Sequence, residues 1–187
     1  MQGRKSITVY EGFGFVMEND FINTRNTSFD ITAEIETKGD KTNGVIISQA
    51  GRFGGWSLYV KDNKPIYVYN FLGIESYAVE SKTALPSGKS TIKLDFAYDA
   101  KPKLGAGGTA TLTVNGKKVG SGRIDKTQFS MWSADESANV GIDRETSVVP
   151  KDYTEETSKF TGKIDKVTIT LKPAKTVKSS PTSRTTQ

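Results

Sequence analysis

The sequence contains neither cysteine nor histidine. Without cysteine the chain can have no disulfide framework, no zinc–thiolate site and no thiol nucleophile. Without histidine it lacks the commonest general base near neutral pH and the commonest imidazole ligand of transition metals. Because these absences remove the usual proton carrier of many hydrolases, they favour a binding or structural domain over an enzyme.

Long apolar runs are also missing from the 187 residues. No stretch approaches the roughly 20 apolar residues of a membrane span, and the N-terminus lacks the apolar core of a signal peptide. We therefore expect no membrane partner and predict no signal peptide in this chain. A chain of this length is expected to form one domain.

The formal net charge of +5 is unevenly distributed along the chain. Four of the 26 basic residues and none of the 21 acidic residues lie in residues 172–187, so the rest of the chain carries a formal net charge of only +1. The C-terminal stretch is rich in Ser, Thr, Pro and Lys and almost free of apolar side chains, so residues 173–187 are predicted to be a disordered basic tail. A near-neutral body gives no reason to expect a nucleic-acid partner.

Alternation of apolar and polar residues predicts β-strands through most of the chain. The period of two is clear in SFDITAEIE (residues 28–36), STIKLDFAYD (residues 90–99) and GKIDKVTITL (residues 162–171). Asn115 and Gly116 lie between two further runs of this kind and predict a two-residue type I′ hairpin. Because no segment has a long helical stripe, the pattern predicts an all-β fold, an antiparallel β-sandwich of jelly-roll type.

The stretch QAGRFGGWSLYV (residues 49–60) combines three glycines with Arg52 and three aromatic residues. A phosphate-binding loop would need a helix after its glycines, and the spacing of the known phosphate motifs is absent. Here the strand-like run WSLYV follows instead. We therefore predict that Gly54 and Gly55 form a tight turn between two antiparallel strands, at backbone angles that suit glycine.

Aromatic residues cluster around this predicted turn. Trp56 lies on the outgoing strand, Tyr69 lies on the return strand of the next hairpin, and Phe53 and Tyr77 lie in flanking loops. Aromatic rings pack in protein cores and also stack on sugar rings. Two interpretations stay open: the rings fill the sandwich core, or they form a carbohydrate-binding surface.

Acidic residues suggest two further sites. Glu34 and Glu36 share the outer face of one strand and would lie about 6.8 Å apart, near the lower edge of the carboxylate spacing of inverting glycosidases. The alternative is a solvated acidic face. In SADESANVGIDRE, the side chains of Asp135, Glu136 and Asp143 offer hard oxygen ligands that suit calcium, although their spacing matches no EF-hand. An acidic loop without metal is the alternative there.

Three segments stand out by their order and spacing: RFGGWSLY (residues 52–59), YNFLG (residues 69–73) and SADESANVGID (residues 133–143). Together with FVMENDFINTRNTSFDITAEIE and FTGKIDKVTI, they resemble the C-terminal domain of long bacterial arylsulfatases. The resemblance covers roughly residues 3–172. That family domain is similar to concanavalin A-like and laminin G-like sandwiches, which agrees with the fold predicted from the strands.

In the resembled enzymes the chemistry belongs to an upstream α/β domain. Its signature is a Cys or Ser two residues before a Pro, with an Arg two residues further on, and its first residue becomes a formylglycine beside a divalent metal. This chain lacks the signature, since Ser179 and Pro181 in the tail are followed by Arg184 one position too late. No catalytic residue of the family can therefore be assigned here.

The resemblance implies a non-catalytic domain that docks on a sulfatase catalytic domain, in cis or in trans, and helps to frame its active site. It also implies a periplasmic or secreted location, with residues 1–6 as a linker remnant and residues 7–172 as the sandwich. No cofactor is expected apart from the calcium considered above.

A carbohydrate-binding module for sulfated glycans is the alternative function, and a glycosidase that uses the two glutamates is a weaker one. In the module, Arg52 would pair with a sulfate, because a guanidinium matches an oxyanion with two parallel hydrogen bonds. The aromatic rings would stack on the sugars. The candidate ligand-binding or interface residues are Arg52, Phe53, Trp56, Tyr69, Asn70 and Tyr77. Exposure separates the two main hypotheses, because a module needs these rings in a groove.

Overall fold

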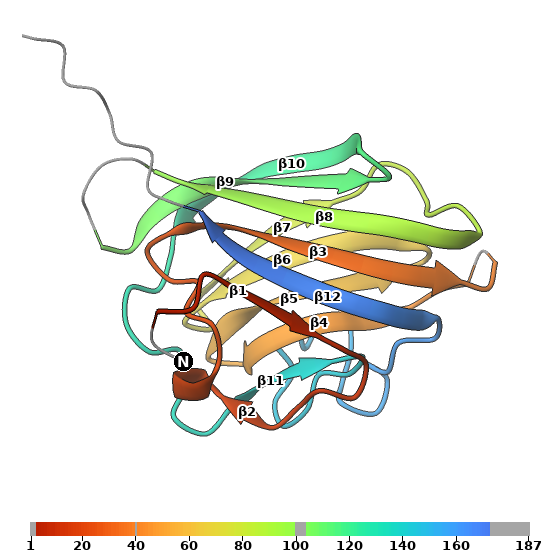
Figure 1. Ribbon diagram of the computed structural model, residues 1–187. Coiled ribbons are helices and arrows are strands. Elements are labelled where there is room, and N and C mark those ends of the chain that lie inside the picture. Colours follow the sequence, from red (N-terminus) through yellow and green to blue (C-terminus); the bar gives the residue numbers. More distant parts are fainter. Residues whose placement is uncertain (1–2, 40, 100–103, 173–187) are drawn as a thin grey trace, which may run out of the picture.

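The computed structural model describes residues 3–39, 41–99 and 104–172, and these form two stacked antiparallel sheets (Figure 1). The first sheet contains, in spatial order, β1 (Ser6–Val9), β12 (Lys163–Lys172), β3 (Ser28–Thr37), β8 (Gly88–Tyr98), β9 (Ala106–Val114) and β10 (Lys117–Lys126). The second contains β2 (Val16–Met17), β11 (Ser137–Val140), β4 (Gly44–Gly51), β5 (Gly54–Lys61), β6 (Lys64–Phe71) and β7 (Glu75–Glu80). The predicted all-β antiparallel sandwich of jelly-roll type is confirmed.

One short 3-10 helix, η1 (Glu18–Asp20), accompanies the strands in the described part of the chain. No helix among the described residues has the length and apolar composition needed to cross a bilayer. The predicted disordered tail, residues 173–187, lies outside the described residues, as do the first two residues of the predicted linker remnant.

The core between the sheets follows the predicted period of two. In β3 the inward residues Phe29, Ile31 and Ile35 are buried, while the alternate polar residues are partly exposed. The register sets Ile31 opposite Leu94 of β8, and Ile169 of β12 on its other side. Each such side chain contributes about 1.5–3 kcal/mol when it leaves water, so this row anchors the first sheet.

The strands β4, β5 and β6 of the second sheet are covered on both faces, which explains their continuous rather than alternating apolar runs. The segment between β11 and β12, residues 141–162, which we call the covering segment, crosses the outer face of this sheet, and Val148, Val149 and Tyr153 pack there. The covered residues of the sheet are Val45, Tyr59, Ile66 and Val68. Strands with two buried faces lose the polar alternation that marks a half-exposed strand.

The turn between β4 and β5 is made by Arg52 and Phe53 rather than by the two glycines that follow them. Gly54 and Gly55 begin β5, with φ angles of +149° and +147° that L side chains rarely adopt. The prediction of antiparallel strands on either side, and of backbone angles that suit glycine, is correct. The prediction that the glycines themselves form the turn is wrong. They lie at the start of β5, where the chain has already reversed direction and still adopts positive φ angles.

The hairpin predicted at Asn115 and Gly116 connects β9 and β10. Their φ angles of +49° and +79° are those of a type I′ turn, in which both central residues are left-handed. Asp62 and Asn63 make the corresponding turn between β5 and β6, with φ angles of +49° and +61°. Short loops of this kind fix the register of the strands that they join.

Candidate functional site

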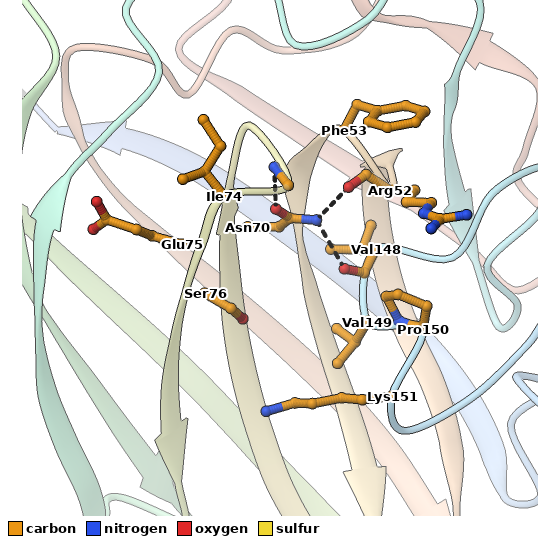
Figure 2. Close-up of a pocket in the computed structure, with 11 residues that line it drawn as sticks. Arg52, Phe53, Asn70, Ile74, Glu75, Ser76, Val148, Val149, Pro150 and Lys151 are labelled. Carbon is orange, nitrogen blue, oxygen red and sulfur yellow. Dashed lines mark hydrogen bonds between the residues drawn. The ribbon is translucent and has the colours of Figure 1, made fainter.

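An open pocket of about 370 Å³ lies at one end of the second sheet, where the β4–β5 turn, the β6–β7 turn and the covering segment meet (Figure 2). Its lining consists of Arg52, Phe53, Asn70, Gly73, Ile74, Glu75, Ser76, Val148, Val149, Pro150 and Lys151. We call it the Arg52 pocket. Its volume falls within the range of small-molecule sites, about 300–1,000 Å³.

Asn70 holds the three walls of the Arg52 pocket together. Its Nδ2 donates hydrogen bonds to the carbonyl oxygens of Arg52 (2.9 Å) and Val148 (3.1 Å), and its Oδ1 accepts one from the Gly73 amide (2.9 Å) (Figure 2). Because both amide hydrogens are used within the protein, Asn70 positions the loops and has no donor left for a ligand. The pocket is therefore built in advance of any binding.

The β6–β7 turn displays apolar side chains beside the pocket. Leu72 and Gly73 have φ angles of +57° and +69°, and the Ile74 amide donates to the Phe71 carbonyl, which closes a type I′ turn. A leucine in the left-handed region costs roughly 1–2 kcal/mol. Ile74 is 76% exposed on this turn. Backbone strain that presents an apolar side chain to solvent is typical of a recognition surface.

Phe53 is the exposed aromatic residue of the pocket, with 69% of its surface accessible. Its ring lies beside the Arg52 guanidinium, whose Cζ is 5.8 Å from the ring centroid. The Arg52 amide donates to Thr146 Oγ1 at 2.9 Å, which fixes the backbone of the turn. The ring and the cation therefore share one rigid turn at the edge of the pocket.

The unpaired charges of the pocket are positive. Neither Arg52 nor Lys151 makes an ion pair with a residue that the structure describes. Glu75 is already matched, because it pairs with Lys126 at 2.5 Å and accepts a hydrogen bond from the Tyr77 hydroxyl. These two partners also hold the pKa of Glu75 below its ordinary value. The pocket thus offers two free cations to an anionic ligand.

Two predicted site residues, Trp56 and Tyr69, lie in the core. Trp56 is 0% exposed, and Tyr69 is buried with its hydroxyl accepting hydrogen bonds from the Gln128 amide (2.6 Å) and Trp132 Nε1 (3.3 Å). The proposal that these two rings stack on sugars is therefore wrong, and the core interpretation holds for them. In β5, Trp56 lies on the same face as the buried Leu58 and Val60, which pack in the core between the sheets.

Tyr77 was predicted to lie in a loop but lies on β7; it is half-buried, packs against the core and does not line the Arg52 pocket. Arg52, Phe53 and Asn70 do line it, so the structure brings together three of the six predicted residues. Sequence reasoning missed Ile74 and Lys151. For Ile74 the sequence held a sign, because a Leu-Gly pair replaces the usual Asn-Gly of a tight hairpin turn. For Lys151 it held none, because nothing in the sequence shows that this residue lies beside the Arg52 pocket.

The glutamates considered for glycosidase chemistry lie on the outer face of the first sheet among lysines. Glu34 pairs with Lys166 at 3.0 Å. Glu36 stands opposite Lys89 on β8 and Lys163 on β12 in the strand register. Cross-strand charge pairs of this kind support a solvated polar face rather than an acid and base pair.

The carboxylates considered for calcium have separate structural partners. Asp135 is exposed and accepts a hydrogen bond from Ser133 Oγ at 2.7 Å. Asp143 is fully buried, accepts from the Val148 amide at 2.9 Å and has its own amide bonded to Ser158 Oγ. Burial raises the pKa of Asp143 to about 6. Across the described ranges no three acidic, histidine or cysteine side chains group as metal ligands, so calcium stays a prediction.

No protein-family model and no curated protein sequence matches this chain. Among solved structures, the CBM40 of Ruminococcus gnavus IT-sialidase bound to α2,3-sialyllactose is similar with a TM-score of 0.55 and 17% identity, over 89% of this chain and 90% of that one. The LG1-3 region of the laminin α2 chain has a TM-score of 0.53 and 13% identity, over 90% of this chain and 32% of that one. Mouse laminin α1 LG4-5 has a TM-score of 0.50 and 15% identity, over 84% and 38%.

The chain has a laminin G-like β-sandwich fold. This laminin G-like fold is the part of the arylsulfatase resemblance that is confirmed. The same structural neighbours provide no link to a sulfatase. At these identities the likeness concerns the fold alone, so the ligand must be argued from the Arg52 pocket.

Proposed function

We propose that this chain is a non-catalytic carbohydrate-binding domain that binds an anionic glycan in the Arg52 pocket. The observation that carries the proposal is the pair of unpaired cations, Arg52 and Lys151, beside the exposed ring of Phe53 in a pocket held by Asn70. The CBM40 of similar fold, bound to sialyllactose, supports a glycan as ligand. The anionic group is a sulfate or a carboxylate on a sugar.

Each wall has a distinct role in this proposal. Arg52 pairs with the anionic group through two parallel hydrogen bonds, and Lys151 adds a second positive charge. Phe53 packs against the apolar face of a sugar ring, the role that the buried Trp56 and Tyr69 cannot take. Ser76 offers a hydroxyl to the sugar. A periplasmic or secreted location, which the arylsulfatase resemblance implies, would bring the pocket to such glycans.

Calorimetry with three related sugars tests this function: sialyllactose, a lactose sulfate and neutral lactose. The wild-type chain is expected to bind the two anionic sugars more tightly than lactose. Arg52→Ala should remove that preference, while Phe53→Ala should weaken all three sugars by a similar factor. Lys118→Ala, an exposed cation on the Asn115-Gly116 hairpin, is the matched control and should bind as wild type does. If wild type and Arg52→Ala bind every sugar with equal affinity, the Arg52 pocket is excluded as the binding site.

A second candidate function is docking on a sulfatase catalytic domain, in cis or in trans. The exposed apolar side chains of Phe53, Leu72 and Ile74 at one end of the sandwich favour it, because exposed apolar surface often marks a protein interface. If the coding sequence beside this chain encodes a sulfatase, the test uses a protein that contains both domains. Leu72→Ser should then separate the domains in limited proteolysis, and because Leu72 does not line the Arg52 pocket, sugar binding by the isolated chain should not change.

A further inference from the structure

A second pocket, of about 570 Å³, lies between the segment before β1 and the segment that connects β2 to β3. It is lined by Gly3, Arg4, Lys5, Glu18, Asn19, Phe21, Asn23, Arg25, Thr27 and Leu171. We call it the N-terminal pocket. It shares no lining residue with the Arg52 pocket, so the two can be altered separately.

Arg25 is held rigidly in the wall of the N-terminal pocket. Its guanidinium pairs with the Glu18 carboxylate, and its Cζ lies 5.2 Å from the ring centroid of Trp132. The Arg25 side chain is only 15% exposed, so its position is set by packing rather than by solvent. A cation fixed in this way loses little conformational entropy when an anion binds to it.

Glu18 offsets one of the three positive charges of the lining, that of Arg25, and leaves those of Arg4 and Lys5. The Glu18 carboxylate is 4% exposed, and its Oε2 also accepts hydrogen bonds from the amides of Trp132 (2.8 Å) and Ser133 (3.2 Å). This single carboxylate therefore holds a loop in place as well as pairing with Arg25.

Two more cations complete the lining. Arg4 and Lys5 are exposed, and neither makes an ion pair within the part of the chain that the structure describes. The Lys5 carbonyl accepts a hydrogen bond from the Leu171 amide at 2.8 Å, which fixes the backbone beside the pocket. The lining thus carries three cations against one carboxylate.

We propose that the N-terminal pocket binds a tetrahedral oxyanion, carried as a sulfate or phosphate ester, independently of the Arg52 pocket. The three cations of the lining come from two chain segments, Arg4 and Lys5 before β1 and Arg25 before β3. Such an arrangement suits the four oxygens of a tetrahedral anion better than the two coplanar oxygens of a carboxylate. Asn19 and Asn23 in the lining can donate to hydroxyl groups of the carrier.

The experiment is a titration of the full chain, labelled with nitrogen-15, with inorganic sulfate, inorganic phosphate and acetate at constant ionic strength. Sulfate and phosphate are expected to shift the amide signals of Lys5, Trp132 and Ser133 and the Trp132 indole signal, with saturation. Acetate should bind at least fivefold more weakly. Glucose 6-sulfate and glucose 6-phosphate then show which ester the pocket prefers.

Two double variants with the same loss of charge separate a site from a general effect of charge. Arg4→Gln with Lys5→Gln removes exposed cations of the pocket and should weaken sulfate binding at least fivefold. Lys117→Gln with Lys118→Gln, at the distant hairpin, should leave it unchanged. Arg52→Ala should also leave it unchanged, so a failure of this proposal is distinct from a failure of the Arg52 pocket. Shifts that never saturate, or that are equally weakened in both double variants, would overturn the proposal.

Discussion

The two glycines at the start of β5 allow the backbone argument to be tested with one pair of substitutions. Gly54 and Gly55 have nearly the same φ, +149° and +147°, so an alanine at either position meets the same conformational cost. Their surroundings differ. An added Cβ at Gly55 would lie 2.2 Å from the Gln49 carbonyl oxygen, whereas at Gly54 its nearest neighbour, Trp132 Cδ1, is 3.4 Å away.

Gly54→Ala is therefore expected to lower the free energy of unfolding by about 1–3 kcal/mol, the cost of an L residue in a region that glycine dominates. Gly55→Ala should lose a further 1–3 kcal/mol or so, because the Gln49 carbonyl belongs to the paired strand β4 and must move. A typical domain has about 5–15 kcal/mol in total, so both variants should still fold.

Urea unfolding followed by tryptophan fluorescence measures both changes, since Trp56 and Trp132 lie close to these positions. With a slope of about 2 kcal/mol per molar urea, an extra loss of 2 kcal/mol moves the midpoint by about 1 M. If both variants lose the same amount, the carbonyl contact at Gly55 has no energetic consequence. If Gly54→Ala unfolds as wild type does, the argument from backbone angles fails.

Four further outcomes are expected. Burial raises the pKa of Asp143 to about 6, so the folded state binds the proton more tightly than the unfolded state, and the free energy of unfolding should fall by about 2 kcal/mol from pH 4.5 to 7.5. Asp143→Asn should remove that dependence in urea melts, and an unchanged slope would refute it. Asn70→Ala should weaken binding of the anionic sugars in calorimetry although it removes no charge, because the three walls lose their common hydrogen-bond partner; wild-type affinity would contradict this. The affinity for a sulfated sugar should fall from 0.05 M to 0.5 M salt, since Arg52 is exposed and screened; a constant affinity would argue against charge pairing. The chain should not hydrolyse aryl sulfates or β-glucans above buffer background, with or without calcium, and a single-turnover burst abolished by Glu34→Gln would overturn this.

The strands could be predicted from the sequence wherever one of their two faces is exposed to solvent. β3 was readable because Ile31 and Ile35 alternate with Glu34 and Glu36, and the outward residues are partly exposed. The covering segment, residues 141–162, could not be predicted, because it has no regular period and packs on strands distant in the chain. Its presence also removed the alternation in β4 to β6 that would have shown which residues face inward.

The candidate site could be predicted in part. Arg52 and Phe53 were identified because a charge and an aromatic residue beside glycines at a strand end had no evident structural role. Trp56 was assigned wrongly as a ligand residue, because an aromatic residue looks the same in a sequence whether it packs inward or faces a sugar. Lys151 could not be found, since it reaches the pocket only through the tertiary path of the covering segment.

The pairing of β1 with β12 has a mechanical consequence. The two strands are antiparallel neighbours, and Ser6 near the start of the described chain stands opposite Thr170 near its end (Figure 1). A force that pulls these two points apart breaks the hydrogen bonds between β1 and β12 one after another, rather than loading all of them at the same time. β1 has only four residues, so it should peel away at low load while the other strands of both sheets remain paired. A domain tethered at both ends would therefore lengthen first at this edge, and the Arg52 pocket, on the other sheet, would keep its shape under tension.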